Sequence, residues 1–159
     1  MRHTTVDSPL GPLTLVAEGD ALVGLYMAGQ AHRPGDERFG EPASDDDPTL
    51  SAAAGQLAEY FAGTRTEFAV PLHPAGTDFQ RAVWQAIAAI PYGETATYTD
   101  LAQEVGRPTA VRAVGAAVGR NPLTVVVPCH RVIGAGGALT GYAGGLDRKR
   151  LLLALEHRS

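Results

Sequence analysis

The stretch Val125–Ile133 (VVVPCHRVI) joins an apolar run to the candidate reactive cysteine, and the fold prediction starts from it. Valine and isoleucine runs of this kind are typical of strands buried on both faces. Because Pro128 cannot donate to a ladder, we expect the strand to end there. Cys129, the only cysteine, then follows a rigid core element and is adjacent to His130. Free cysteine is among the most buried residue types, so the pattern alone leaves open a nucleophile or an inert structural thiol.

The composition is that of an ordinary globular protein. The chain has 159 residues, of which 45% are hydrophobic and 19% charged, which suits one domain or two small ones. No apolar stretch reaches the roughly 18 residues of a membrane span, and the start lacks a signal-peptide core. A lone cysteine suits a reducing compartment. We therefore expect a cytoplasmic protein without a membrane partner.

The charge is divided unevenly along the chain. The net charge is −4, but residues 1–75 carry −7 and residues 76–159 carry +3. Such a difference in charge between the two halves suggests that one of them binds a polyanion. Surface charges are more often simply solvated, so the asymmetry only favours a nucleic-acid partner for the second half.

The first 75 residues are expected to form a small antiparallel sheet with one helix. Turn residues separate three short apolar runs, and Asp47-Pro48 is typical of a helix start. The polar stretch Gly29–Asp47 is interpreted as a long mobile loop. The expected elements are strands around His3–Val6, Pro12–Ala17 and Leu22–Met27, a helix to Phe61, and a candidate fourth strand at Glu67–Leu72.

The second domain, residues 76–159, is expected to be mainly helical. Pro71–Gly76 is the candidate linker, and two short helices separated by Gly106 match a helix-turn-helix, a pattern also common in helical domains that bind no DNA. The predicted fold class is therefore α+β, with the active-site strand in the helical part. The expected elements are a helix from Thr77 or Asp78 to Ile90 with Trp84 in the core, helices at Thr99–Val105 and Pro108–Gly119, a strand at Leu123–Val127, and a last helix capped by Asp147 with Leu151, Leu152 and Leu155 inward.

The second helix of this pair has an unusual face. Arg112, Gly115, Ala116 and Gly119 recur at helical spacing, opposite the valines expected to face the core. Glycine in a helix interior costs about 1 kcal/mol relative to alanine, and close approach to another surface is the usual reason for it. The alternative is packing on a neighbouring helix. A nearly bare face with one long cation suits a sequence-indifferent approach to a narrow groove.

A cysteine nucleophile needs help to lose its proton, because free cysteine has a pKa of about 8.5. His130 is adjacent in sequence, and Glu156 on the last helix is the best acidic candidate to orient a histidine. Cys129, His130 and Glu156 are therefore a candidate relay.

The longer sequence pattern resembles a known family. Pro128–Val132 (PCHRV) is similar to the active-site motif of the O6-alkylguanine-DNA alkyltransferases, also called methylated-DNA–protein-cysteine methyltransferases. Residues 1–75 resemble the family's variable domain only loosely. The similarity runs in order through residues 76–156, in the segments Gly76–Gln80, Val83-Trp84, Ile90–Glu94, Tyr98, Arg112–Gly115, Asn121-Pro122, Gly141–Leu146 and Leu152–Glu156.

The resemblance implies direct, irreversible transfer of an alkyl group from guanine O6, and from thymine O4, to Cys129. It implies no cofactor, one reaction per molecule, and flipping of the damaged nucleotide out of the duplex. His130 and Glu156 match the pair that draws the thiol proton away through a water. The partner is double-stranded alkylated DNA, bound in the minor groove without sequence preference by a protein expected to be monomeric, with clustering on DNA left open.

Further roles follow from the same resemblance. Tyr98 matches the tyrosine that assists flipping, and Arg112 the arginine that replaces the flipped base, with Gly115 and Ala116 on the same DNA-binding face. Asn121 ties the active-site strand to the helix-turn-helix. The substrate pocket is assigned to Tyr98, Val132, Tyr142, Ala143 and Lys149.

Two departures and three rivals accompany this interpretation. Ala143 stands where some members have serine, which leaves the tolerated alkyl size open. Some members bind zinc in the N-terminal domain, but no cysteine occurs there, so we expect no metal. The rivals are a cysteine hydrolase or acyltransferase, a regulatory DNA-binding protein, and a lesion-binding relative without repair activity, which has tryptophan where this chain has Cys129.

Overall fold

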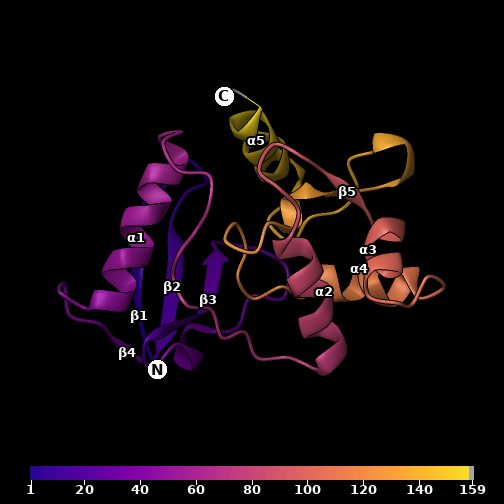
Figure 1. Cartoon of the computed structure of the whole chain (residues 1–159). Coiled ribbons are helices and arrows are strands. Elements are labelled where there is room, and N and C mark those ends of the chain that lie inside the picture. Colours follow the sequence, from indigo (N-terminus) through magenta and orange to yellow (C-terminus); the bar gives the residue numbers. More distant parts are fainter. Residues whose placement is uncertain (158–159) are drawn as a thin grey trace.

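Four strands form the N-terminal sheet, in the order β3-β2-β1-β4. In the computed structural model, which describes residues 1–157, the sheet and one helix lie beside a helical C-terminal part (Figure 1). The first three strands pair antiparallel, whereas β4 runs parallel to β1. The predicted α+β class is confirmed. The strand bounds are β1 (Arg2–Val6), β2 (Leu13–Glu18), β3 (Ala21–Met27) and β4 (Glu41–Pro42).

The prediction of a fourth strand at Glu67–Leu72 is wrong. Within that described segment only Leu72 pairs, through a single parallel bridge to Leu22. The fourth strand lies at β4, inside the stretch predicted to be a loop, which also contains the 3-10 helix η1 (Asp36–Arg38). Pro42 has no N–H to donate, so β4 is short and lies at the sheet edge.

Helix α1 (Pro48–Phe61) packs against the sheet (Figure 1). The Asp47 carboxylate caps it by accepting the N–H of Leu50 at 3.0 Å, and Arg2 on β1 pairs with the same carboxylate. Because α1 is capped and tied to β1 at one end, its inward face is held at a fixed place over the sheet. Tyr60, the residue before the last one of the helix, is fully buried.

Helix α2 (Asp78–Ala88) is the centre of the C-terminal part. Thr77 and Gln80 form a capping box at its start. Its apolar face packs against α3 (Tyr98–Glu104) and α4 (Val111–Gly119). Trp84 is only 3% exposed, as predicted, and its indole N–H donates to the carbonyl of Ala117 on α4 at 2.8 Å.

The turn between α3 and α4 contains Gly106 at φ +75°, where glycine is favoured. Helix α4 begins at Val111, three residues later than the predicted Pro108. The N–H of Ala110 donates to the carbonyl of Arg107, which closes a turn with Pro108 at its second position, where proline is favoured. The six residues Val105–Ala110 therefore join the two helices, a connection longer than the three or four residues of a standard helix-turn-helix turn.

The predicted strand at Leu123–Val127 is wrong, although its burial is correct. Val125 has φ +72°, and the N–H of Val127 donates back to the carbonyl of Leu123 at 2.8 Å. The segment is a buried turn held by side-chain bonds from Asn121 rather than by a ladder. Positive φ is strained for a β-branched residue, so the surroundings must impose it. The short strands of this part are β5 (Ala96–Thr97) and β6 (Val132–Ile133), which pair in parallel.

Helix α5 (Leu146–Glu156) begins after Gly145, whose φ is +91°. Asp147 lies in its first turn and is not the cap, and Leu151 is 37% exposed instead of inward, so both predictions are wrong. Leu152 is buried as predicted. No described helix is long and apolar enough to cross a membrane.

We predict that Trp84→Phe lowers the free energy of unfolding by about 1–3 kcal/mol, because it removes the indole donor to the Ala117 carbonyl and leaves space where the larger ring packed. The N–H of Arg120 still donates to that carbonyl at 3.2 Å. Urea unfolding would measure the change. Gln85→Ala, at an exposed position on the same helix, should stay within about 0.5 kcal/mol of the wild type. Equal effects of the two substitutions would show that the indole bond contributes nothing.

Candidate active site

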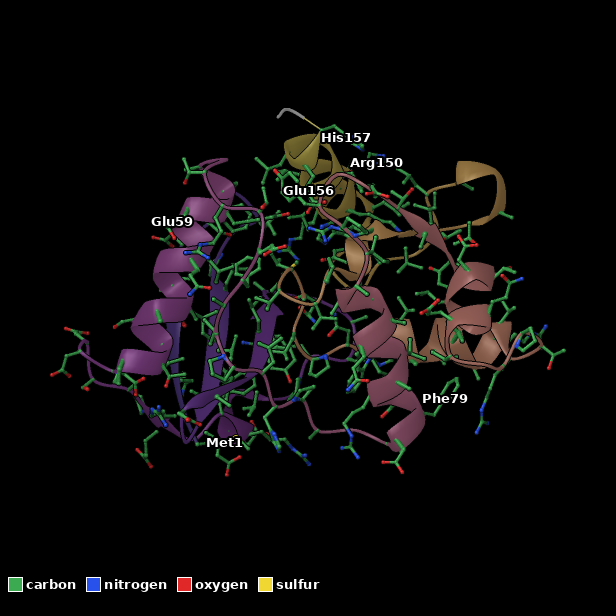
Figure 2. The ribbon with its side chains drawn as sticks, viewed as in Figure 1. Met1, Glu59, Phe79, Arg150, Glu156 and His157 are labelled. Atoms are coloured by element: carbon green, nitrogen blue, oxygen red, sulfur yellow. The ribbon has the colours of Figure 1, made fainter. Side chains whose placement is uncertain are left out.

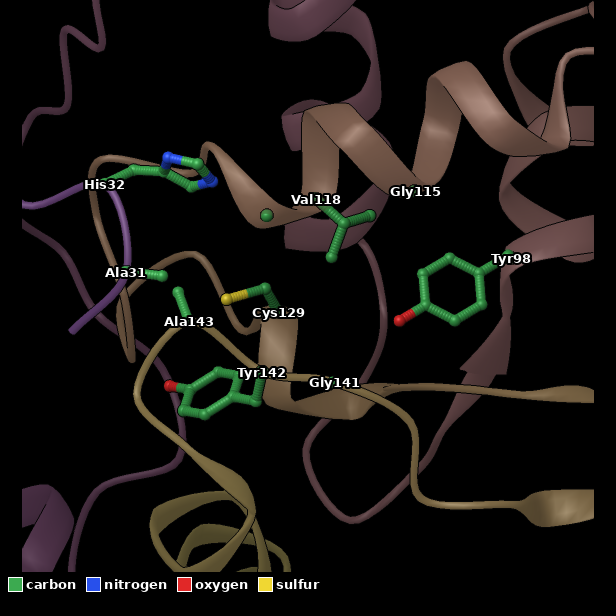
Figure 3. Close-up of a pocket in the computed structure, with 10 residues that line it drawn as sticks. Ala31, His32, Tyr98, Gly115, Val118, Cys129, Gly141, Tyr142 and Ala143 are labelled. Carbon is green, nitrogen blue, oxygen red and sulfur yellow. The ribbon is translucent and has the colours of Figure 1, made fainter.

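Cys129 lies at the start of the 3-10 helix η2 (Cys129–Arg131) and faces a cavity (Figure 3). The thiol belongs to a residue that is only 2% exposed. The cavity measures about 310 Å³ and lies between α4, the loop that follows β3 and the loop that precedes α5. The residues around it are Ala31, His32, Tyr98, Gly115, Val118, Gly119, Cys129, Gly141, Tyr142 and Ala143.

His130 and Glu156 are brought together as predicted. The distance from His130 Nε2 to Glu156 Oε2 is 2.6 Å, and both side chains are buried. The carboxylate can only accept, so the proton is assigned to Nε2. Nδ1 of His130 is then an unprotonated acceptor, buried and without a hydrogen-bond partner in the described part of the chain. Burial lowers the pKa of His130 even though Glu156 opposes the change. The neutral ring therefore has a free acceptor.

Glu156 also accepts hydrogen bonds from two residues that the sequence did not single out. Arg131 donates from Nε to Oε1 at 2.8 Å and from Nη2 to Oε2 at 3.0 Å. Tyr60 donates its hydroxyl to Oε2 at 2.5 Å. Burial alone would raise the pKa of Glu156, but the bonds from His130, Arg131 and Tyr60 outweigh it and hold this pKa at about 2. Glu156 is thus an anion at neutral pH.

The Cys129 thiol is protonated at neutral pH. Burial raises its pKa to about 11, against the lowering influence of Asn121, Lys149 and Tyr142. At pH 7 the thiolate is therefore only a very small fraction of the molecules. Attack by this sulfur requires a group that takes its proton during the reaction.

Lys149 is buried at the first turn of α5, where a cation is unexpected. Its Nζ donates to the carbonyl of Val132 at 2.5 Å and to the carbonyl of Thr140 at 3.2 Å. Two of the predicted pocket residues are therefore bonded to each other. The Val132 carbonyl has one lone pair left for a substrate donor.

Asn121 supports the segment that carries the thiol. Its amide donates to the carbonyl of Val127 at 2.9 Å, and its oxygen accepts the N–H of Leu123 at 2.9 Å. This is the predicted tie, although it holds a turn and not a strand.

The cavity wall opposite α4 comes from the loop before α5. The hydroxyl of Thr140 donates to that of Tyr98 at 3.0 Å, which joins this loop to the start of α3. Tyr142 is partly buried, its hydroxyl oxygen is buried and unpaired in the described chain, and burial raises the pKa of the phenol well above its ordinary value. The carbonyl of Ala143 accepts the N–H of Ala31 at 2.7 Å. The N-terminal part thus contributes to the cavity, which the sequence did not indicate.

The predicted DNA-binding face of α4 is open on the outside. Arg112 and Ala116 are exposed and do not line the cavity, whereas Gly115 does. A Cβ added to Gly115 would lie 3.9 Å from the ring of Tyr98. A side chain much larger than alanine there would crowd Tyr98.

Comparison with known proteins shows the family. Residues 1–74 match the ribonuclease-like domain, and residues 78–158 the DNA binding domain, of 6-O-methylguanine DNA methyltransferase. The methylated-DNA–protein-cysteine methyltransferase of Mycobacterium tuberculosis is 51% identical over 156 residues, 98% of this chain and 92% of the relative. The inducible enzyme of that name from Bacillus subtilis is 47% identical, over 87% of this chain and 82% of its own.

The solved structures agree. Mycobacterium tuberculosis OGT in complex with DNA superposes with a TM-score of 0.89 at 51% identity, covering 99% of this chain and 93% of that one. The O6-methylguanine DNA methyltransferase from Methanococcus jannaschii gives 0.70 at 29% identity, covering 98% and 94%. The fold and site therefore define a cysteine-dependent protein of the alkyl-transfer class. The chain belongs to the 6-O-methylguanine DNA methyltransferase family.

We predict that Glu156 makes stability depend on acidity. Its pKa is about 2 when folded, against an ordinary value of 4.5, so its contribution is present above pH 4.5 and is lost as the pH falls toward 2. In that window the unfolding free energy of the wild type should fall more steeply than that of Glu156→Gln, by up to about 1.4 kcal/mol per pH unit.

Urea unfolding at a series of pH values would measure both slopes. Glu59→Gln is the control, because Glu59 is 52% exposed and lies on α1 away from Glu156 (Figure 2). It should retain the wild-type slope. Equal slopes for the wild type and Glu156→Gln would contradict the depressed pKa.

Proposed function

We propose that this protein repairs DNA by moving an alkyl group from O6 of guanine in duplex DNA onto Cys129, irreversibly and once per molecule. The observation that carries the proposal is a buried cysteine facing a cavity, preceded by a helix pair and followed by a histidine bonded to a buried carboxylate. The relatives' names give the reaction class, methylated-DNA–protein-cysteine methyl transfer. Thymine O4 is a second proposed substrate.

The reaction balances without a cofactor. The Cys129 sulfur forms a bond to the alkyl carbon, and the bond from that carbon to O6 breaks with its electron pair left on the base. His130 takes the thiol proton, through a water, and the released guanine gains a proton at N1. Glu156 stabilises the imidazolium that forms in between. The product thioether has no easy leaving group, so the protein is consumed.

The site residues have proposed roles in base recognition. The nucleotide is flipped into the cavity, where Tyr98 donates to the base and the Ala143 amide donates to O6. The Val132 carbonyl, held by Lys149, accepts from the guanine amino group. Tyr142 closes the alkyl end of the pocket, and its ring, which lines the cavity, limits the group that fits.

DNA binding is proposed for the open face of α4. Arg112 enters the stack where the base has left, while Gly115 and Ala116 let the helix approach the minor groove closely without reading sequence. We propose a monomer in the cytoplasm, in which residues 1–75 and 76–159 are two domains.

Mass spectrometry after incubation with excess O6-methylguanine duplex tests the reaction. We expect one added methyl group per chain, located on Cys129, and a repair yield that stops at one lesion per molecule. Cys129→Ser should bind the same duplex and transfer nothing measurable, since a hydroxyl is far less nucleophilic than a thiolate. Repeated turnover would favour a hydrolase or acyltransferase instead, and an unmodified Cys129 with intact binding would favour a lesion-binding protein.

Arg112→Ala tests the flipping step. We expect a loss of about tenfold or more in the transfer rate on duplex DNA and little change on the free base O6-methylguanine, because a free base leaves no gap to fill. Arg65→Ala removes the same charge from the N-terminal part, where Arg65 pairs with Glu59, and should leave both rates unchanged. Equal losses on both substrates would place Arg112 in the support of the pocket.

A further inference from the structure

The hydroxyl of Tyr60 links the N-terminal helix to the proposed proton relay. Tyr60 lies 96 residues before Glu156 in sequence, yet its Oη is 2.5 Å from Glu156 Oε2. The side chain is fully buried. No other residue of α1 has a described hydrogen bond to a member of the Cys129, His130 and Glu156 set. The contact is therefore a specific one between the two parts of the chain.

The rings packed around Tyr60 fix the direction in which its hydroxyl points. The Tyr60 ring packs against three other rings at centroid distances of 5.3 Å for Phe61, 5.4 Å for Phe68 and 6.3 Å for Tyr92. Burial and the charge of Glu156 raise the pKa of Tyr60, so the phenol keeps its proton and remains a donor. A rigid donor at this distance determines where Oε2 can lie.

Oε2 is also the oxygen that receives the imidazole. It accepts from Tyr60 and from His130 Nε2, and from Arg131 Nη2 at a longer 3.0 Å. Each donor takes part of the carboxylate's negative charge. The tyrosine thus competes with the histidine for the same acceptor while holding it in place.

We propose that Tyr60 is a positioning residue for the relay: it fixes the Glu156 carboxylate against His130 and limits how strongly that carboxylate attracts the imidazole proton. The inference deepens the proposed function and rests on it. It also gives the N-terminal part a direct effect on transfer, through one hydrogen bond to α5.

Removal of the Tyr60 hydroxyl should change the pKa of His130 in a definite direction. Without it, more of the Glu156 charge acts on His130, which stabilises the imidazolium and raises the pKa of His130. As the pH falls, the His130 ring of the variant therefore becomes protonated, and can no longer accept the thiol proton, at a higher pH than in the wild type. Arg131 and Lys149 are unchanged and still oppose the imidazolium charge. The titratable and charged groups around the relay are Tyr60, Tyr92, Cys129, His130, Arg131, Tyr142, Lys149 and Glu156.

Tyr60→Phe tests the proposal, with Tyr92→Phe as the matched control. Tyr92 belongs to the same ring cluster, but its hydroxyl donates only weakly, at 3.5 Å, to the carbonyl of Leu155. Single-turnover transfer to Cys129 from an O6-methylguanine duplex would be followed across the pH range in which histidine titrates. Duplex affinity and thermal unfolding would be measured beside it.

For Tyr60→Phe we expect a rate about tenfold lower at neutral pH, because misplacement of Glu156, and with it of His130, outweighs the greater basicity of the ring. The acid limb of the rate profile should move to higher pH, and duplex affinity should stay within about twofold, as for a residue remote from the groove. Tyr92→Phe should keep the wild-type rate and profile. An unmoved acid limb, or equal effects of the two variants, would overturn the proposal in favour of a purely structural tyrosine.

Magnetic resonance of the His130 ring separates this inference from the proposed function. The Nε2–H signal reports the bond to Glu156 whether or not any alkyl group is transferred. We expect it to shift in Tyr60→Phe and to stay in place in Tyr92→Phe. If the wild type transfers nothing but the signal shifts, the proposed function fails while the positioning survives. If transfer occurs and the signal is unchanged, Tyr60 does not position Glu156.

Discussion

The buried carboxylate of Glu156 connects the parts of the molecule that the site needs. An unpaired anion in the protein interior is strongly disfavoured, so its position is set by whatever donors surround it. Here the donors come from α1, from η2 and from the histidine beside the thiol. The arrangement of sheet, turn and last helix is therefore constrained by one charge.

Burial has two effects on the Cys129 thiol: it keeps the thiol unreactive in the free protein, and it favours the proposed transfer. A pKa of about 11 keeps Cys129 protonated, which protects the only cysteine from adventitious oxidation and alkylation. In the proposed reaction the same dry surroundings would strengthen every interaction with a bound base. The neutral His130 has a free Nδ1, which is the acceptor that the proposal assigns to the thiol proton.

Local sequence signals predicted most of the fold, and contacts between distant segments account for the misses. The three antiparallel strands and α1, α2 and α5 follow from turn chemistry and periodicity. Burial of Leu123–Val127 was also predicted, but side-chain bonds from Asn121 replace the ladder and bend the backbone. In the site, family resemblance paired His130 with Glu156. Nothing in the sequence pointed to a role for Tyr60 in the site, because an aromatic residue on an amphipathic helix normally belongs to the core. Its partner Glu156 is also 96 residues away.

The basic half of the chain does not present all of its charge to a partner. Arg131 is paired with Glu156, and Lys149 is bonded to backbone carbonyls. These two cations of residues 76–159 are therefore engaged inside the protein and do not face a partner. Arg148 is bonded to the carbonyls of Leu10 and Ala28 in the N-terminal part. The attraction of phosphates then rests on a few exposed arginines, among them Arg112 on α4. In the proposed complex, so little long-range charge means that close fit of the glycine-bearing face supplies much of the binding. The small size of Gly115 and Ala116 supports this proposal, because a reader of base edges would carry long polar side chains there.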